Sequence, residues 1–217
     1  MRVIIAGGSV FAVDVAKSLL KRGINNITLI VEDREDALKA NGEVPSITVV
    51  NASPSKHEVL HELDMDKCDA FVSATEREEV SILAALYAKK HNVKRIYVKT
   101  AKEDTKDLMK NLGMIPIDIN ESASNNVVLD IAEPLIYELV GVGVGLLDIR
   151  EKYVNDYPNL IGKKLGEIEG KLFNAIAVYQ DEKFLLSADT VIKENSSLIL
   201  WGESGQDEKM VKELKKV

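Results

Sequence analysis

A glycine turn between a buried strand and a helix constrains the fold of this chain more than any other stretch. The apolar run at residues 3–6 predicts a buried strand, and residues 7–9 (Gly-Gly-Ser) follow it at once. Apolar residues then recur at helical spacing from 11 to 20, and residues 27–31 predict a second strand that leads into Glu32 and Asp33. This order is typical of the first βαβ unit of a nucleotide-binding sheet.

The physical chemistry of such a turn favours an anion. The N-terminus of the following helix has unpaired N–H groups and the positive end of the helix dipole, and both face the carboxyl edge of the sheet. The pattern G-x-G-x-x-G/A falls on Gly7, Ser9 and Ala12, so a serine replaces the second glycine. A glycine turn that only packs the helix on the strand is the alternative, and the motif alone leaves both open.

Net charge and cysteine content exclude several classes of protein. The net charge of −7 argues against nucleic-acid or anionic-membrane partners, because both attract basic surfaces. The only cysteine, Cys68, excludes an internal disulfide framework and suits a reducing compartment. No run of about 18 apolar residues is present to insert into a bilayer. The first strand begins directly after Met1 and Arg2, which leaves no room for a signal peptide, so we expect a cytoplasmic protein.

Strands alternate with helices through the first 130 residues. This alternation predicts an α/β fold, a Rossmann-like doubly wound parallel sheet, over residues 1–130. Pro116 suits a strand at the edge of the sheet, because proline cannot donate to a ladder, and Gly113 suits the end of the preceding helix. The further strands are expected at residues 46–50, 70–74, 95–99 and 115–119, and the further helices at 34–41, 56–63, 76–90 and 104–112.

The chain changes character after residue 130. We expect a helical stretch at residues 124–140, bent or interrupted near Pro134, and a glycine-rich hinge at 141–145, so residues 131–145 connect two domains. Residues 146–217 predict a small α+β domain. Its strands are expected at 147–150, 174–179, 183–186 and 197–202, the middle two as a hairpin, with a turn and short helix at 161–168 and a terminal helix at 206–216.

Small and polar residues gather at the predicted carboxyl ends of the strands. Ligands of doubly wound sheets bind at this edge, so we predict a nucleotide-binding crevice there, with Glu32 and Asp33 placed to meet the hydroxyls of a ribose. Residues 51–54 also have the composition of a simple turn. The candidate nucleotide-binding residues are Gly7, Gly8, Ser9, Val10, Phe11, Glu32, Asp33, Asn51, Ala52, Ser53, Ala74, Thr75, Glu76 and Lys99.

The sequence contains no evident catalytic set. His57 and His61 are spaced to share a metal, but no third ligand follows at a fixed spacing, which favours a solvated helix face. His91 ends a predicted helix, where a cation complements the dipole. No G-x-S-x-G, C-x-x-C or G-x-x-x-x-G-K-[ST] motif is present. The pattern therefore indicates nucleotide binding without turnover; an NAD(P)-dependent oxidoreductase is the alternative that the βαβ unit alone supports.

The stretch at 124–140 is more apolar than a connection needs. Its apolar residues suit packing in the core of one chain, or a crossover helix that buries them against a second chain, and the sequence leaves both open. The residues concerned are Val127, Val128, Ile131, Leu135, Ile136 and Leu139.

Taken together, the motifs resemble the cytoplasmic regulatory subunits of Trk/Ktr-type potassium uptake systems, whose repeat is the RCK or KTN domain. In the first half the likeness rests on the turn at 3–12, the acidic end of strand two, residues 50–53 (VNAS), 70–75 (AFVSAT) and 97–99 (YVK), and Gly113. In the second half it rests on residues 160–165 (LIGKKL), 175–178, 189–192 and 198–202, which resemble the RCK C-lobe. The likeness covers nearly all of the chain.

The resemblance implies a homodimer that assembles into a higher ring at the inner face of the membrane, beneath a potassium transporter or channel subunit. Members bind NAD(H) or an adenine nucleotide (ATP, ADP or AMP) in the crevice of the N-lobe, and binding gates the pore. Lys99 matches a basic residue of the family on strand five. Glu121 matches an acid near the phosphates or a cation, so Glu121 joins the candidate site.

Three positions depart from the family pattern. Members that bind nucleotide tightly usually carry Gly at the position of Ser9, Arg at that of Val10 and Asp at that of Val31. Here the acid comes one or two residues later, as Glu32 or Asp33. A ring scaffold that binds no ligand is therefore a further alternative to a nucleotide sensor.

Overall fold

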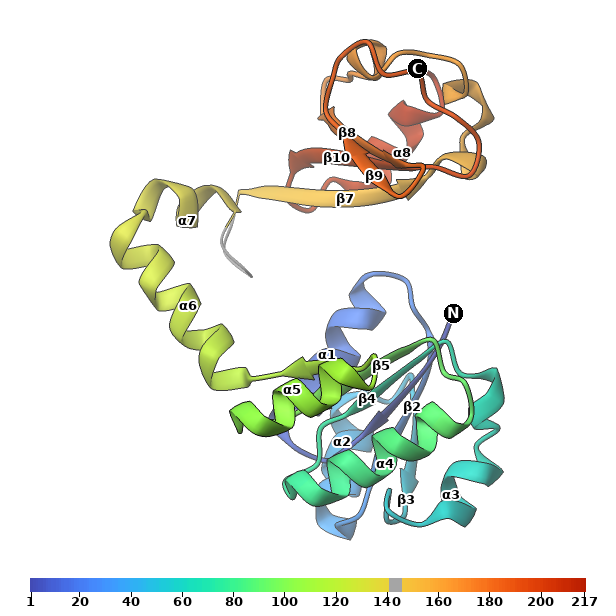
Figure 1. The fold of residues 1–217 in the computed structure, drawn as a ribbon, viewed down its shortest axis with the longest axis vertical. Coiled ribbons are helices and arrows are strands. Elements are labelled where there is room, and N and C mark those ends of the chain that lie inside the picture. The colour runs from blue at the N-terminus through green and yellow to red at the C-terminus, as the bar shows by residue number, and fades with distance from the viewer. Residues whose placement is uncertain (141–145) are drawn as a thin grey trace. The chain divides into compact units, whose positions relative to one another are not determined.

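The computed structural model describes residues 1–140 and 146–217, which form two compact units, Met1–Ser122 and Ala123–Val217 (Figure 1). The predicted glycine-rich hinge at 141–145 lies outside the described residues. Each unit has a sheet and a hydrophobic core of its own.

The first unit is built on a six-stranded parallel sheet with the order β3-β2-β1-β4-β5-β6. Two halves run outward from β1 and β4, and this order defines a doubly wound sheet with its switch point between those two strands. The predicted Rossmann-like fold is therefore confirmed. The strands are β1 (Arg2–Ala6), β2 (Asn26–Val31), β3 (Thr48–Asn51), β4 (Ala70–Ser73), β5 (Arg95–Lys99) and β6 (Ile115–Ile117).

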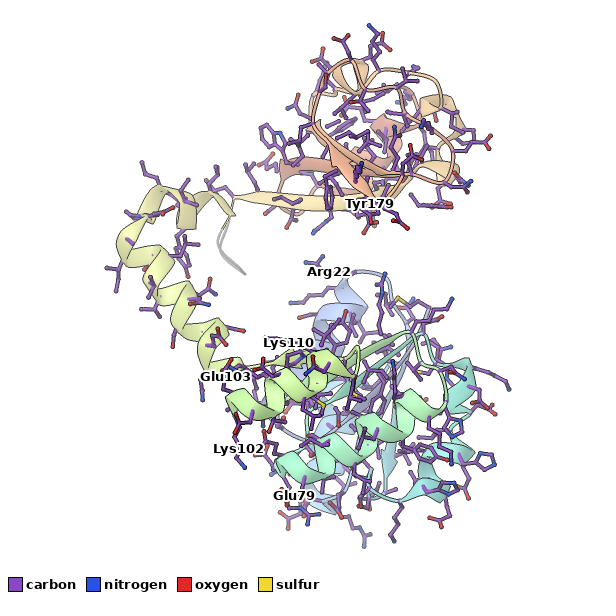
Figure 2. All side chains as sticks on the ribbon, viewed as in Figure 1. Arg22, Glu79, Lys102, Glu103, Lys110 and Tyr179 are labelled. Atoms are coloured by element: carbon purple, nitrogen blue, oxygen red, sulfur yellow. The ribbon has the colours of Figure 1, made fainter. Side chains whose placement is uncertain are left out.

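The central strands are mostly apolar because both faces of the sheet are covered. Successive side chains of a strand point to opposite faces, so Val3 and Ile5 pack in one core with α1 and α2, while Ile4 packs in the other with α3, α4 and α5. The outer faces of the helices carry charged side chains, including Glu79 and Lys110 (Figure 2). The helices are α1 (Val10–Lys21), α2 (Arg34–Glu43), α3 (His57–Glu62), α4 (Glu78–Lys90) and α5 (Glu103–Asn111).

Two local predictions of the first unit agree with the structure. Gly113 follows the C-cap of α5 with φ +70°, a conformation that glycine adopts without steric cost. Pro116 lies in the edge strand β6, which has a neighbouring strand on only one side. The backbone N–H that proline lacks is therefore not needed for pairing with a second strand.

The chain after β5 differs from the prediction in one way and agrees with it in another. Strand β6 ends at Ile117, and helix α6 (Ile119–Ala132) begins where strand was expected. The cause is Asp118, whose Oδ1 accepts the N–H of Glu121 at 3.0 Å and so starts the helix. The predicted interruption near Pro134 is confirmed: α6 is followed by a separate helix, α7 (Pro134–Val140), because Pro134 cannot continue the hydrogen bonding of α6.

The second unit contains a four-stranded antiparallel sheet with the order β7-β10-β8-β9, as an α+β fold requires. Strands β8 and β9 form the predicted hairpin, and the two residues that join them, Asp181 and Glu182, have φ of +52° and +61°. One core lies between the sheet, short 3₁₀ turns and α8. The elements are β7 (Leu147–Tyr153), β8 (Phe173–Gln180), β9 (Lys183–Leu185), β10 (Ser197–Glu203) and α8 (Asp207–Leu214).

Candidate functional site

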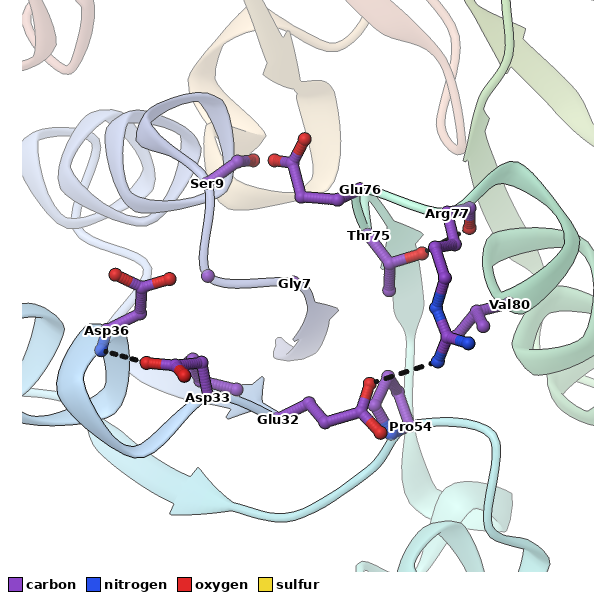
Figure 3. Close-up of a pocket in the computed structure, with 12 residues that line it drawn as sticks. Gly7, Ser9, Glu32, Asp33, Asp36, Pro54, Thr75, Glu76, Arg77 and Val80 are labelled. Atoms are coloured by element: carbon purple, nitrogen blue, oxygen red, sulfur yellow. Dashed lines mark hydrogen bonds and ion pairs between the residues drawn. The ribbon is translucent and has the colours of Figure 1, made fainter.

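A crevice of about 450 Å³ lies at the carboxyl edge of the parallel sheet, where β1 and β4 diverge (Figure 3). It is the position at which doubly wound sheets bind ligands. Among the residues proposed from the sequence, Gly7, Gly8, Ser9, Glu32, Asp33, Thr75 and Glu76 line it. Five further lining residues were not among the predicted ligand-binding residues: Val31, Asp36, Pro54, Arg77 and Val80.

The floor of the crevice is a turn that only glycine can form. Gly7 has φ +134°, and a Cβ there would lie 2.3 Å from the carbonyl oxygen of Ala74. A Cβ on Gly8 would lie 2.6 Å from Val31 Cγ1. The two glycines therefore let β1, β2 and β4 approach closely while the chain turns into α1.

The N-terminus of α1 is open to an anion. Ser9 is the N-cap, and its Oγ lies 3.4 Å from the amide nitrogen of Ala12 and 3.4 Å from the carbonyl oxygen of Ala74. The first turn of α1 has no acidic residue, whereas α2, α4 and α5 each have two. The dipole of α1 is therefore not offset by its own side chains.

The two carboxylates after β2 both have partners within the protein. Asp33 is the N-cap of α2, and its Oδ1 accepts the N–H of Asp36 at 2.9 Å. Glu32 Oε2 lies 3.4 Å from Arg77 Nη2, an ion pair that joins the β2–α2 loop to the β4–α4 loop (Figure 3). An ionised carboxylate has about four acceptor sites, so both residues keep capacity for a ribose hydroxyl.

The charge of the crevice is predominantly negative. Its described lining contains the carboxylates of Glu32, Asp33, Asp36 and Glu76 and one guanidinium, that of Arg77. Apolar atoms come from Val31, Pro54 and Val80. The arrangement combines a helix N-terminus for a phosphate, carboxylates for hydroxyls and an apolar surface for a ring.

The residues at the end of β3 and directly after it support the crevice from behind. Asn51 Nδ2 donates to the carbonyl oxygens of Val31 at 2.9 Å and Glu32 at 3.0 Å, which fixes the end of β2. Ser53 Oγ lies 3.0 Å from Ser55 Oγ, and Ala52 packs against the core. None of Asn51, Ala52 or Ser53 is among the lining residues, whereas the following Pro54 is.

Four other proposed residues also lie outside the lining. Ala74 is fully buried and contributes its carbonyl oxygen to the contact with Gly7 and Ser9. Phe11 packs against the core, Val10 is 78% exposed, and Lys99 is half-buried at the end of β5. Their part in ligand binding stays a prediction.

Glu121 belongs to a separate charged cluster centred on Lys106. Lys106 Nζ lies 2.8 Å from Asp118, 2.8 Å from Glu121 and 3.2 Å from Glu103, joining α5 to the start of α6. Hydrogen bonds to Asp118 and Glu121 raise the pKa of Lys106 above its usual value. The hydrogen bond from Lys106 lowers the pKa of Asp118. The proposed role of Glu121 toward phosphates or a cation stays a prediction.

The three histidines share one surface formed by α3 and α4. The ring of Tyr87 lies 4.9 Å from that of His57 and 4.5 Å from that of His91, centroid to centroid. His91 Nδ1 lies 2.5 Å from Asp66 Oδ1. Within residues 1–140 and 146–217, no group of three His, Cys, Asp or Glu side chains is arranged to hold a metal ion.

Known proteins resemble this chain over its first unit, and some resemble it over nearly its whole length. The family model of the TrkA-N domain matches residues 3–120, which span the glycine turn and the whole parallel sheet. This chain belongs to the TrkA-N family. The predicted resemblance to Trk/Ktr-type RCK regulatory proteins is thereby confirmed.

Curated relatives of this TrkA-N protein are named for potassium uptake. A Trk system potassium uptake protein TrkA homolog of Methanothermobacter thermautotrophicus is 22% identical over 92% of both chains. A homolog of the same name from Pyrococcus abyssi is 25% identical over 100% of this chain and 99% of its own. The TrkA protein of Vibrio alginolyticus is 22% identical over 92% of this chain but only 44% of its own length.

Solved structures support the fold. The human SLO3 gating ring matches 96% of this chain and 45% of its own, with a TM-score of 0.58 and 14% identity. A GsuK channel bound to NAD matches 98% of this chain and 39% of its own, with a TM-score of 0.50 and 19% identity. Across the described residues, no helix combines the length and apolar character needed to cross a bilayer.

Proposed function

We propose that this TrkA-N protein is a cytoplasmic regulatory subunit of a potassium transporter or channel. It binds a nucleotide, NAD(H) or one of ATP, ADP and AMP, in the crevice of its first unit, and binding gates the membrane pore. Support comes from the family, from relatives named for potassium uptake, and from the NAD-bound channel with a similar fold.

The observation that carries the nucleotide proposal is the free N-terminus of α1 over the glycine turn. The backbone N–H groups that follow Gly7 suit a pyrophosphate, because the dipole of α1 has no acid in its first turn. Glu32 and Asp33 lie across the same crevice and suit ribose hydroxyls, while Val31 and Val80 supply apolar surface for a base. The residues present therefore fit a dinucleotide or an adenine nucleotide.

Dimerisation is supported by the apolar side chains of α6 and α7. None of the α6 side chains is buried in the single chain, and several large apolar ones are strongly exposed. We infer that a second copy covers them, and that dimers assemble into a ring next to the potassium pore at the inner face of the membrane. The exposed residues are Val127, Val128, Ile131, Leu135, Ile136 and Leu139.

Regulation then requires that a nucleotide favours one arrangement of the assembly over another. A ligand shifts a conformational equilibrium only by the difference between its affinities for the two states. The nucleotide site and the pore are thereby coupled. If a nucleotide changes the affinity of the assembly for the pore by some factor, binding to the pore changes the affinity for the nucleotide by the same factor.

A pair of isosteric variants tests nucleotide binding. Ser9→Asp and Ser9→Asn both keep an N-cap acceptor for α1, but only aspartate adds a negative charge where the phosphates would bind. Thermal melting is recorded with NAD⁺, NADH, ATP, ADP and AMP. At a ligand concentration roughly 100 times Kd, wild type should gain about 2.7 kcal/mol. Ser9→Asp should lose the shift, and Ser9→Asn should keep more of it.

Two other functions predict different results in the same experiment. A ring scaffold that binds no ligand predicts no shift with any nucleotide. An NAD(P)-dependent oxidoreductase predicts a shift with dinucleotides and turnover of a small substrate, for which the described lining of the crevice offers no imidazole, lysine or tyrosine.

Potassium transport is tested in the organism that produces this chain. Rubidium uptake is measured in cells that lack the chain and in cells that express wild type, Ser9→Asp or Ser9→Asn. Wild type and Ser9→Asn should restore regulated uptake, and Ser9→Asp should not. Uptake that is identical in all four strains would contradict the proposal.

A further inference from the structure

Glu76 differs from the other acids of the crevice because the described residues offer it no hydrogen-bond or ion-pair partner. Glu32 is paired with Arg77, and Asp33 caps α2. Asp36 Oδ1 lies 3.5 Å from Lys39 Nζ. The carboxylate of Glu76 instead points toward Ser9, at the N-terminus of α1 (Figure 3).

The loop that carries Glu76 is held on both sides. Thr75 Oγ1 donates to the carbonyl oxygen of Arg77 at 2.7 Å, and the N–H of Thr75 donates to Ser81 Oγ at 3.1 Å. Thr75 and Ser81 are buried. The backbone of Glu76 therefore cannot withdraw from the crevice without breaking buried hydrogen bonds.

We propose that Glu76 is a specificity-determining residue that selects against nucleotides with high phosphate charge; this inference rests on the proposed nucleotide site. The N-terminus of α1 attracts a phosphate, and the Glu76 carboxylate opposes each additional negative charge at the same point. The guanidinium of Arg77 does not offset it, because Arg77 is paired with Glu32.

The charge of the ligand then decides its affinity. The terminal phosphate of ADP and ATP is joined to the rest of the molecule by a single anhydride bond and carries roughly −2 at neutral pH. Each phosphate of NAD⁺ is substituted on both sides and has a smaller charge, and the nicotinamide ring of NAD⁺ is cationic. The crevice therefore prefers NAD⁺ to ADP, and ADP to ATP.

Calorimetric titration of wild type and two variants tests this preference. Dissociation constants for NAD⁺, ADP and ATP are measured with EDTA present, so that no divalent cation bridges Glu76 to a phosphate. Glu76→Gln should strengthen ADP binding about fivefold and ATP binding by more, as expected for loss of one like charge near the surface. NAD⁺ binding should change less than about twofold.

Glu79→Gln is the matched control. Glu79 is exposed on the first turn of α4 and does not line the crevice (Figure 2). The Glu79→Gln substitution therefore removes the same charge from the same region without changing the lining. The ratio of the ADP and NAD⁺ dissociation constants should stay at the wild-type value in this variant.

The outcomes separate this inference from the proposed function. If Glu76→Gln leaves the ADP to NAD⁺ ratio unchanged, or shifts it no more than Glu79→Gln does, the inference is overturned while the nucleotide site stands. Weaker ADP binding in Glu76→Gln would also overturn it, since Glu76 would then assist the phosphates. If neither wild type nor Glu76→Gln binds any of the three nucleotides, the proposed nucleotide site itself fails.

Discussion

At the scale of single residues, Gly7 decides whether the turn under the crevice can form. An alanine there meets the Ala74 carbonyl oxygen at 2.3 Å and must adopt φ +134°. We expect Gly7→Ala to lower the free energy of unfolding by roughly 2–4 kcal/mol, measured by urea denaturation. Gly23→Ala is the control, because Gly23 also has a positive φ (+81°) but no atom within 4 Å. Gly23→Ala should lower the free energy of unfolding by about 1 kcal/mol. Equal losses in the two variants would contradict a steric clash at Gly7.

The carboxylate of Asp118 stabilises the junction between α5 and α6. Its pKa is lowered in the folded protein by Lys106, so its contribution is present above the unfolded value of 3.8 and is lost as the pH falls through the folded pKa. Asp118→Asn should therefore lower the urea midpoint at pH 7, and its difference from wild type should shrink as the pH falls below 3.8.

Glu121→Gln serves as the comparison for Asp118→Asn. The side chain of Glu121 is 61% exposed and that of Asp118 only 11%, although both lie 2.8 Å from Lys106 Nζ. Solvent screens the exposed pair more strongly, so Glu121→Gln should have the smaller effect. A difference between wild type and Asp118→Asn that is constant from pH 7 to pH 3 would contradict the account.

At the scale of elements, the hydrophobic pattern was enough to locate β5. Residues 95–99 were predicted as a strand, and β5 has these bounds. The start of α6 was predicted wrongly, because the alternation of apolar residues at 115–119 favoured a strand up to residue 119. The residues that start the helix lie at the end of this stretch. Asp118 and Glu121 have the spacing of a helix-starting pair, and Asp118 does cap the helix.

Helices α6 and α7 carry the prediction for assembly. Ile131 is 77% exposed in the single chain, so a charge at this position should be harmless to a monomer and disruptive to an interface. We expect Ile131→Glu to reduce the oligomer to a smaller species in light scattering coupled to size exclusion. Asn125→Glu, at an exposed polar position of the same helix, should leave the mass unchanged. An unchanged mass in both variants would contradict a crossover role for α6.

At the scale of the whole molecule, the sequence predicted the location of the crevice better than its lining. Glu32 and Thr75 could be placed at the crevice from the sequence, because they follow parallel strands whose carboxyl ends share one edge. Asn51 was predicted there on the same ground, but its side chain turns back to the carbonyl oxygens at the end of β2. Arg77 was missed although it follows Thr75 by two residues, since its pairing with Glu32 depends on two loops far apart in the chain.

Hydrogen–deuterium exchange of the wild-type protein, measured with and without saturating NAD⁺, shows where a nucleotide binds. We expect slower exchange in the peptides that contain Gly8 and Ser9, Glu32 and Asp33, and Thr75 to Arg77, which line one crevice. No change anywhere, or protection confined to Ala123–Val217, would contradict the proposed nucleotide site.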